Sequence, residues 1–346
     1  MKTNPGNYFE DFRLGQKLTH ATPRSVTAGD VALYQALYGP RFALQSSDEF
    51  ARALGLDRAP VDDLLAFHIV FGKTVPDVSL NAIANLGYAD CRFLARVFPG
   101  DTLTAVSEVI GLKETSSGKT GIVWVRSTGT NQHGHDVLSY VRWVMVAKRD
   151  PAAPVPPPHV PDLPAAVDAL SAPEAIDFTR WNFALSGAPH RWGDYAPGER
   201  IDHVDGVTVE EAEHMMATRL WQNTAKVHFD QHAANAGRFG RRLVYGGHVI
   251  GIARALSFNG LANAGLIAAI NGGSHANPTF AGDTIYAWSE VLERIESPGR
   301  ADVGALRLRL VAAKNHPCAD FPLKDSEGRY RPEVVLDLDY TVLIPR

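Results

Sequence analysis

The order of hydrophobic and polar positions is the same in the two halves of the chain. In each half a short strand leads into a helix, over residues 26–39 and 207–221. A mostly apolar helix follows, over 60–75 and 243–258. Neither of these later helices has a clean polar face, which is typical of a helix that is buried on most sides. The pattern therefore predicts two similar units, each with one central helix.

Segments in which hydrophobic and polar residues alternate follow each buried helix. In the first half, residues 121–130 and 135–148 flank a turn at 131–134, which predicts a hairpin. In the second half, residues 305–315 and 332–345 alternate in the same way, and we expect them to flank a turn too. A curled antiparallel sheet around one buried helix is the hotdog architecture. We therefore expect an α+β fold, a double hotdog.

Four short sequence matches in the same order indicate an internal duplication. The clearest pairs "PGDTLTAVSEV" (99–109) with "AGDTIYAWSEV" (281–291), at an offset of 182 residues. The other three matches pair 10–16 with 193–199, 25–31 with 206–212, and 84–90 with 270–276. We interpret the shared GDT as turn chemistry between strands, not as a phosphate-binding motif.

A proline-rich stretch separates the two halves. Residues 151–164 hold seven prolines in fourteen positions. Proline fixes φ and removes a backbone donor, so this segment favours an extended, semi-rigid conformation. We assign 1–150 to an N-terminal hotdog, 151–180 to a linker and 181–346 to a C-terminal hotdog.

Composition narrows the class of protein. The chain of 346 residues has a formal net charge of −4, which argues against a general nucleic-acid surface. Cys91 and Cys318 are isolated, so neither a zinc site nor a disulfide framework is indicated, and both fit a reducing compartment. The chain begins without the apolar region of a secretory signal and contains no long apolar run. We expect a cytoplasmic protein with no membrane and no nucleic-acid partner.

The stretch "NTAKVHFD" (223–230) holds the candidate catalytic residues. It resembles the signature of the MaoC-like hydratase family, G-D-x-N-P-L-H, in which an aspartate and a histidine lie five residues apart. His228 takes the histidine position, and Asn223 falls where the aspartate is expected. Lys226 replaces the proline, and Asp230 matches an acidic residue that often follows the motif. This resemblance covers nearly the whole chain.

The matching stretch of the first half is residues 38–55. Gly39 and Leu44 fit the family signature, but Pro40 stands at the aspartate position and Gln45 at the histidine position. Neither proline nor glutamine can act as a base. We therefore expect the first half to be catalytically silent, to pair its sheet with the second half and to shape an acyl-CoA tunnel.

Two segments, 7–16 and 59–95, resemble a narrower group within this family. That resemblance implies reversible addition of water to mesaconyl-C1-CoA, which gives β-methylmalyl-CoA, in bacterial carbon-assimilation routes such as the ethylmalonyl-CoA pathway. It also implies a coenzyme A thioester as substrate, no other cofactor and no metal. Association into a homo-oligomer is left open.

Hydrating an enoyl thioester requires stabilisation of negative charge on the thioester oxygen. Gly246 and Gly247 start the second buried helix, in a segment that resembles the family's H-G-M. Backbone N–H groups at a helix N-terminus stabilise such charge, and glycine leaves the approach open. His228 is suited to exchange protons near neutral pH. Asn223 either positions the water or caps the loop.

The substrate's own carboxylate explains the missing aspartate. In mesaconyl-C1-CoA this carboxylate is bonded to the β-carbon, so an aspartate at position 223 would face a second negative charge. Asn223 hydrogen-bonds without that repulsion. We expect Lys226, Arg219 or Arg41 to supply the counter-charge, although Lys226 also fits a solvated side chain or a contact with a CoA phosphate.

Two rival functions stay open from the sequence. A hotdog thioesterase would use the same fold, with Asp62 or Asp63 as the carboxylate on the buried helix. A non-catalytic acyl-CoA-binding or scaffold protein would explain why one half has lost both motif residues and the other has lost one. Of the remaining histidines, His68 is expected to be packed in the core and His248 to be structural.

Overall fold

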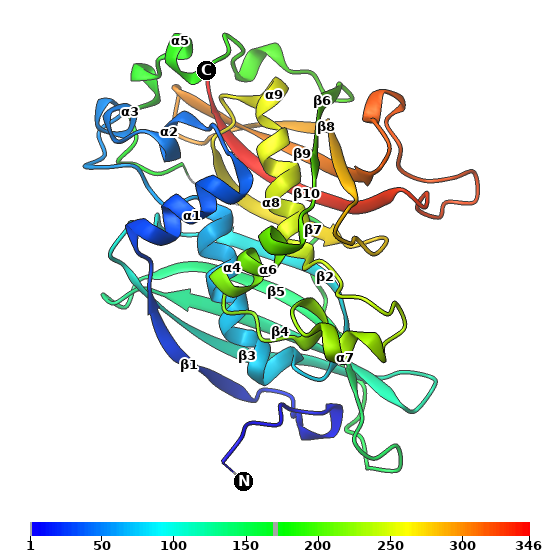
Figure 1. Cartoon of the computed structure of the whole chain (residues 1–346). Coiled ribbons are helices and arrows are strands. Elements are labelled where there is room, and N and C mark those ends of the chain that lie inside the picture. The colour runs from blue at the N-terminus through cyan, green and yellow to red at the C-terminus, as the bar shows by residue number, and fades with distance from the viewer. Residues whose placement is uncertain (1, 169–171) are drawn as a thin grey trace.

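The computed structural model describes residues 2–168 and 172–346. Its strands form one antiparallel sheet of ten strands, in the order β1-β3-β4-β5-β2-β7-β10-β9-β8-β6. Figure 1 shows the sheet curling behind the two central helices, α4 and α8, with the strands of the first half at the bottom of the view and the strands of the second half at the top. The predicted double hotdog is confirmed, and its two sheets are continuous.

The first half contains five strands and the helix α4 (Asp63–Thr74). All twelve residues of α4 are buried, which is why the sequence shows no polar face there. The helix packs against β3, β1 and β4. The strands are β1 (Lys17–Ser25), β2 (Ala82–Phe93), β3 (Thr102–Glu114), β4 (Thr120–Thr130) and β5 (Asp136–Ala147).

The second half repeats this plan around α8 (Gly246–Leu256), of which every residue except Gly246 is buried. The helix packs against β8, β9, β6 and β10. The strands are β6 (Arg200–Thr208), β7 (Leu266–Ser274), β8 (Thr284–Glu296), β9 (Val303–Lys314) and β10 (Val334–Pro345).

The turn expected between β9 and β10 is wrong. A long excursion, residues 315–333, connects the two strands and contains the short helix η6 (Cys318–Asp320). It folds back on the outer face of the sheet, where the Trp288 indole N–H donates to the carbonyl of Pro322 at 3.0 Å. Cys318 of this excursion packs with Trp288 of the sheet in a small buried cluster, which a tight turn could not form.

Matching turns bear out the internal duplication. Gly100 and Gly282 both have positive φ, 105° and 93°, a backbone conformation that favours glycine. In each turn the next residue, Asp101 or Asp283, accepts a hydrogen bond from the backbone N–H three positions earlier, at 2.8 and 2.9 Å. The two GDT segments are therefore strand-to-strand turns, as predicted.

Two further helices, α1 and α6, are about as long as α8 and pack with it at the junction of the halves (Figure 1). The other α-helices have four to six residues. The bounds are α1 (Ala28–Tyr38), α2 (Ala43–Ser46), α3 (Asp48–Ala53), α5 (Phe183–Ser186), α6 (Glu211–Leu220), α7 (Gln231–Asn235) and α9 (Phe258–Leu261), with single turns η1 (Phe9–Asp11), η2 (Val75–Ser79), η3 (Phe178–Arg180), η4 (Trp192–Asp194) and η5 (Lys226–His228).

The proline-rich segment is anchored along the sheet. His159 exchanges two backbone hydrogen bonds with Leu112, both of 2.8 Å, and the Val167 N–H donates to Asn271 Oδ1 at 2.9 Å. The first contact lies in the first half and the second contact in the second half. Residues 169–171 of the predicted linker lie outside the described residues.

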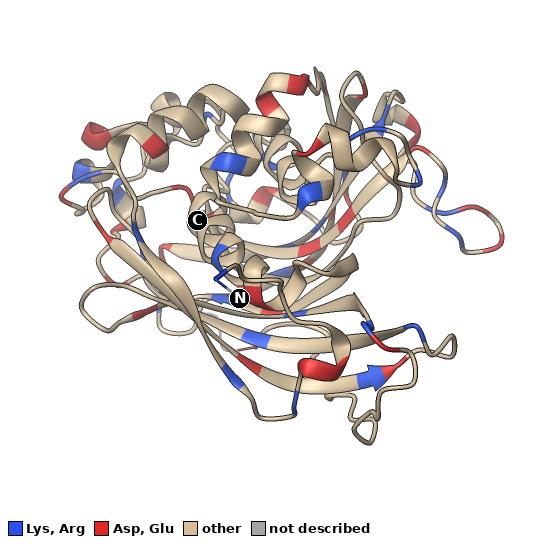
Figure 2. Cartoon of the chain, turned by 60° about the horizontal axis from the view of Figure 1, so that its bottom comes forward, with Lys and Arg blue, Asp and Glu red and all other residues tan. Residues whose placement is uncertain are grey.

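Charged residues are scattered over both halves, with basic and acidic residues intermixed (Figure 2). Cys91 and Cys318 are both buried free thiols. Of the helices in residues 2–168 and 172–346, none has the length and apolar character needed to cross a membrane.

Candidate active site

A cavity of about 510 Å³ lies between the two halves. Its volume is typical of a site for a small molecule or a cofactor. The first half contributes residues from α4, η2, β2 and β5, and the second half contributes the loop before α8, the start of α8 and the segment after β7. The polar side chains of its wall include Asn85, Tyr88, Arg142, Asn223, His228, Arg238, Tyr245 and His275.

His228 presents a free ring nitrogen in this cavity. Its Nδ1 lies 2.9 Å from the carbonyl oxygen of Leu243, which can only accept, so Nδ1 carries the proton. The lone pair is then on Nε2, which has no hydrogen-bond partner among the described residues. Burial lowers the pKa of His228 to about 4, so the ring is neutral at pH 7. The imidazole is therefore held in the tautomer of a base.

Asn223 shares the cavity wall with His228. Its Oδ1 accepts a hydrogen bond from the Ala225 N–H at 3.0 Å, so the side chain caps the loop. This leaves the amide Nδ2 to donate towards a ligand. The loop lies against the first half, because Gly72 of α4 lets the Trp221 carbonyl approach where a Cβ would overlap it.

The start of α8 places one of the two predicted glycines in the wall. Gly246 is the first residue of the helix, and the preceding Tyr245 provides no side-chain cap. A Cβ at Gly246 would overlap the His275 ring, so only glycine allows the two to approach. A Cβ at Gly247 would instead meet His68 in the core, and Gly247 does not line the cavity. The N-terminal end of the helix dipole favours negative charge beside Gly246.

His275 and Tyr88 line the cavity but were not among the predicted site residues. His275 Nε2 lies 3.1 Å from the Tyr88 hydroxyl, which comes from β2 of the first half. Burial and the nearby His228 together lower the pKa of His275 to about 4. The repeat match of 84–90 with 270–276 contains both residues, but repetition alone does not indicate chemistry.

The structure does not bring the predicted substrate-binding charges to the cavity. Lys226 and Arg219 are exposed and lie outside its wall. Arg41 is exposed and stacks its guanidinium 4.4 Å over the Phe258 ring. Asp230 caps the helix α7, with its Oδ1 accepting from the Ala233 N–H at 3.0 Å. The predicted charges lie in or near the motif stretch of one half or the other in sequence, but Lys226, Arg219 and Arg41 do not line the cavity.

His68 and His248 lie in the packed core beside the cavity. The His68 ring contacts that of Trp221, with centroids 4.5 Å apart, and His248 Nδ1 lies 2.8 Å from the Tyr38 hydroxyl. Burial lowers the pKa of both histidines to about 3. Within the described residues, no group of three or more His, Cys, Asp or Glu side chains is arranged to hold a metal ion.

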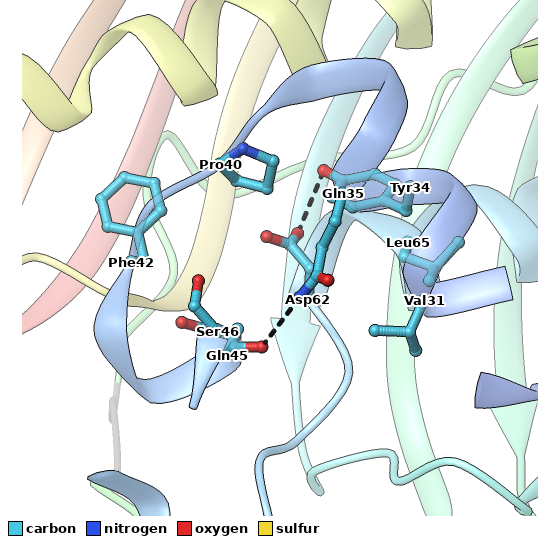
Figure 3. Close-up of a pocket in the computed structure, with 9 residues that line it drawn as sticks. All are labelled: Val31, Tyr34, Gln35, Pro40, Phe42, Gln45, Ser46, Asp62 and Leu65. Atoms are coloured by element: carbon cyan, nitrogen blue, oxygen red, sulfur yellow. Dashed lines mark hydrogen bonds between the residues drawn. The ribbon is translucent and has the colours of Figure 1, made fainter. Parts of the chain in front are cut away.

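The first half has a much smaller pocket at the position of its altered motif (Figure 3). Its volume is about 10 Å³, roughly enough for one water molecule. Pro40 and Gln45 line it, and Figure 3 shows the Tyr34 hydroxyl pointing at Asp62, to which it donates at 3.2 Å. Burial raises the pKa of Asp62 to about 6. No acyl chain fits in this space.

Asp63 is also fully engaged. Arg96 donates to its Oδ1 at 2.5 Å, and the Ile267 N–H donates to its Oδ2 at 2.8 Å. Both carboxylates that a thioesterase would use are therefore structural. Asp62 caps α4 by accepting from the Leu64 N–H at 2.9 Å.

A double hotdog in which one half carries a neutral histidine beside the N-terminus of its central helix defines a protein of the MaoC-like class. The comparisons with known proteins identify the family within that class. A family model described as Mesaconyl-CoA hydratase matches residues 2–321. The chain belongs to this family.

Curated relatives and solved structures agree with this assignment. The chain is 65% identical to the beta-methylmalyl-CoA dehydratase of Chloroflexus aurantiacus, covering 100% of this chain and 99% of that protein. It is 65% identical to the mesaconyl-CoA hydratase of Cereibacter sphaeroides, covering all of both chains. A MaoC domain protein structure from Chloroflexus aurantiacus, 65% identical, superposes with a TM-score of 0.98 over 100% of this chain and 99% of that one.

A more distant structure shows the same architecture. A conserved hypothetical protein from Mycobacterium tuberculosis, described as having a double hotdog fold, superposes with a TM-score of 0.77 at 26% identity. The match covers 98% of both chains.

Proposed function

We propose that this chain catalyses the reversible hydration of mesaconyl-C1-CoA to β-methylmalyl-CoA. The observation that carries the proposal is the free Nε2 of the neutral His228, which faces the same cavity as the N-terminus of α8 at Gly246. The family membership and the names of the two relatives that are 65% identical supply the substrate.

The geometry assigns a role to each group in the hydration direction. Water bound at His228 Nε2 loses a proton to it as its oxygen bonds to the β-carbon. The π electrons move to the α-carbon and onto the thioester oxygen, where the Gly246 N–H and the helix dipole stabilise the developing charge. His228 then returns the proton to the α-carbon. The net change is addition of one water, with no cofactor beyond the CoA of the substrate.

Asn223 fits a positioning role in this scheme. Its Oδ1 holds the loop, while its Nδ2 is available to donate to the attacking water or to the substrate. An amide at this position adds no charge beside the substrate's carboxylate.

The mouth of the cavity suits the CoA moiety. Arg238 and Phe239 line it from the loop before α8, and Phe239 is 40% exposed. Ile83, on β2, is 64% exposed at the same opening. A cation for the phosphates and exposed apolar side chains for the pantetheine arm are the groups that such a ligand needs.

The two rival functions find less support. The carboxylates of a thioesterase, Asp62 and Asp63, are buried in hydrogen bonds away from the large cavity. A purely binding protein would not need the fixed tautomer of His228. Two buried free thiols fit a reducing compartment, and we propose a cytoplasmic location.

The direct test is to incubate the protein with β-methylmalyl-CoA and follow the absorbance of the enoyl thioester. The proposal expects that absorbance to rise to an equilibrium level without release of free CoA thiol. Thiol release without the enoyl signal would instead identify a thioesterase. No change in either signal would favour the binding protein.

A further inference from the structure

The cavity wall contains a buried arginine with no acidic partner. Two arginines line the cavity, and Arg238 is exposed at the mouth, whereas Arg142 is only 1% exposed. In the part of the chain that the structure describes, no Asp or Glu side chain pairs with Arg142. A buried guanidinium without a counter-charge is costly, so such groups are found where an anion completes them.

The contacts of Arg142 are neutral and incomplete. Its Nη2 donates to the Thr74 hydroxyl at 2.7 Å and to the Ser79 hydroxyl at 3.2 Å. The guanidinium lies 4.2 Å over the Phe71 ring. Its Nε is buried and has no hydrogen-bond partner in residues 2–168 and 172–346. These contacts fix the plane of the fork and leave donors for a ligand.

Arg254 shows what a compensated buried arginine looks like in this chain. It is 4% exposed and donates to the Ser257 hydroxyl and to the carbonyl of Ala264. Burial raises the pKa of Asp62 and Asp63, and the charge of Arg254 opposes that shift, so both acids are close enough to share its field. Burial lowers the pKa of Arg142, and the groups that oppose this shift are tyrosines.

A second unpaired polar group lies beside Arg142. Both the Oδ1 and the Nδ2 of Asn85 are buried, and neither finds a hydrogen-bond partner among the residues that the structure describes. Asn85 lines the same cavity. In the sheet Asn85 faces Val144, two residues along β5 from Arg142, so the two side chains share one face. An arginine fork and an amide on one wall form a site for a carboxylate.

This wall connects directly to the proposed catalytic groups. Arg142 faces Tyr88 in the strand pairing, and the Tyr88 hydroxyl lies 3.1 Å from His275 Nε2. His275 in turn lies against Gly246 at the start of α8. A carboxylate held at Arg142 is thus on the β5 wall of the cavity that also contains the base and the helix N-terminus.

We infer that Arg142, assisted by Asn85, binds the free carboxylate of the substrate and selects dicarboxylic enoyl-CoA thioesters over neutral ones. The inference rests on the proposed function and deepens it. The carboxylate of mesaconyl-C1-CoA is bonded to the β-carbon, so fixing it orients the carbon that water attacks. In this proposal Arg142, from the first half of the chain, supplies the counter-charge for the substrate's carboxylate.

The test measures binding of two unreactive thioesters by calorimetry. The saturated 2-methylsuccinyl-C1-CoA carries the carboxylate, and 2-methylbutanoyl-CoA has a methyl group in its place. Arg142→Met should weaken the first ligand by on the order of 100-fold and the second by less than about threefold. Arg142→Lys, which keeps the charge and loses the fork, should fall between wild type and Arg142→Met for the first ligand.

The matched control is Arg238→Met at the cavity mouth, which should weaken both ligands alike. If Arg142→Met changes the two affinities by the same factor, the inference is overturned. Should that variant not fold, Asn85→Ala replaces it, with an expected selective loss of roughly tenfold for the carboxylate ligand; an equal loss for both ligands would again overturn the inference. The proposed function fails separately, if wild type does not interconvert β-methylmalyl-CoA and its enoyl thioester.

Discussion

The two halves of this chain share a fold and differ in the space beside their central helices. The second-half helix α8 starts with glycines at a cavity of about 510 Å³. Beside α4 of the first half, the pocket at the altered motif holds about 10 Å³. Pro40, Phe42 and Tyr34 fill that region, and Asp62 caps the helix where the second half has no side-chain cap. A duplicated fold therefore keeps its framework while a few side chains close one of two equivalent sites.

The closed half still contributes to the open site. Arg142 and Tyr88 in the cavity wall come from the strands β5 and β2. The strands β5 and β10 are equally long, and their seventh residues are Arg142 and Tyr340. The position that provides a buried cation to the large cavity is thus a tyrosine in the other half. The two halves have therefore both diverged, and the first half forms one wall of the site.

The largest expected effect comes from removing the base. His228→Ala should lower kcat by about 100-fold or more, which is typical for a positioned acid–base group. The matched variant in the closed half, Gln45→Ala, should keep kcat within about twofold, because Gln45 lies outside the large cavity. Steady-state hydration rates with a thermal melt of each variant measure this. Similar losses of kcat in both variants would contradict the claim that only the second half carries the catalytic base.

Adding a side chain at Gly246, the start of α8, should also lower activity at the large cavity. A Cβ in Gly246→Ala would overlap the His275 ring and displace it or the helix N-terminus, so we expect a fall in kcat of about 100-fold. Gly193→Ala is the control, because a Cβ there meets nothing within 4 Å. Full activity in Gly246→Ala would mean that this helix end does not contact the thioester.

A charge change in the motif should separate two substrates. Asn223→Asp places a second anion near the substrate's carboxylate, and at an intermediate dielectric this costs about 1–2 kcal/mol. That corresponds to roughly a tenfold loss in kcat/KM for mesaconyl-C1-CoA, with no loss for 2-methylbut-2-enoyl-CoA, which has a methyl group there. Equal losses for both substrates would identify Asn223 as a loop residue only.

Acid should destabilise the fold through its buried histidines. Burial lowers the pKa of His203, His228 and His275 to about 4, whereas in the unfolded chain each titrates near 6.5. Between these values the unfolded state binds more protons, so stability is fully present above about pH 6.5 and is lost as the pH falls towards 4.

Each histidine contributes up to about 1.4 kcal/mol per pH unit across that window. Asp62 opposes them, because its raised pKa stabilises the fold as the pH falls through about 6. Burial raises the pKa of Asp63 as well. Two acids do not offset these three histidines together with His68 and His248, whose pKa burial lowers to about 3, so urea midpoints should decrease from pH 7 to pH 5. A midpoint that rises over this range would contradict the burial of neutral imidazoles.

The smallest effect is expected from Lys226 and Arg219, the charged residues near the motif that were predicted to bind the substrate. Lys226→Ala and Arg219→Ala remove exposed side chains outside the cavity, so kcat/KM should change by less than about threefold. A selective tenfold loss of kcat/KM for mesaconyl-C1-CoA in either variant would show that the residue replaced binds the substrate's carboxylate.

The sequence allowed the fold to be predicted because its periodicity is local. The buried helix expected at 60–75 is observed as Asp63–Thr74, and the shortening at its start follows from Asp62 acting as the cap. The long connection between β9 and β10 was not predicted. Alternation of hydrophobic and polar residues predicts the strands, but it does not predict the path of the chain between them.

Only those site residues that lie in the motif or close to it in sequence were predicted. His228, Asn223 and Gly246 lie within 24 residues of one another and meet in the cavity. Arg142 and Tyr88 reach it from the strands β5 and β2, and His275 reaches it from the residue that follows β7. The pairing of β2 with β7 that joins the halves has no short-range signature. Arg41, Arg219 and Lys226, which were predicted as counter-charges, lie in or near the motif stretches of the two halves and do not line the cavity.

The most direct test of this asymmetry is a crystal structure of the wild-type protein with 2-methylsuccinyl-C1-CoA. The account predicts one acyl group per chain, in the cavity between the halves, with its carboxylate on Arg142 and its thioester oxygen at the Gly246 N–H. An acyl group seated beside α4 at Pro40 and Gln45, or one in each half, would contradict it.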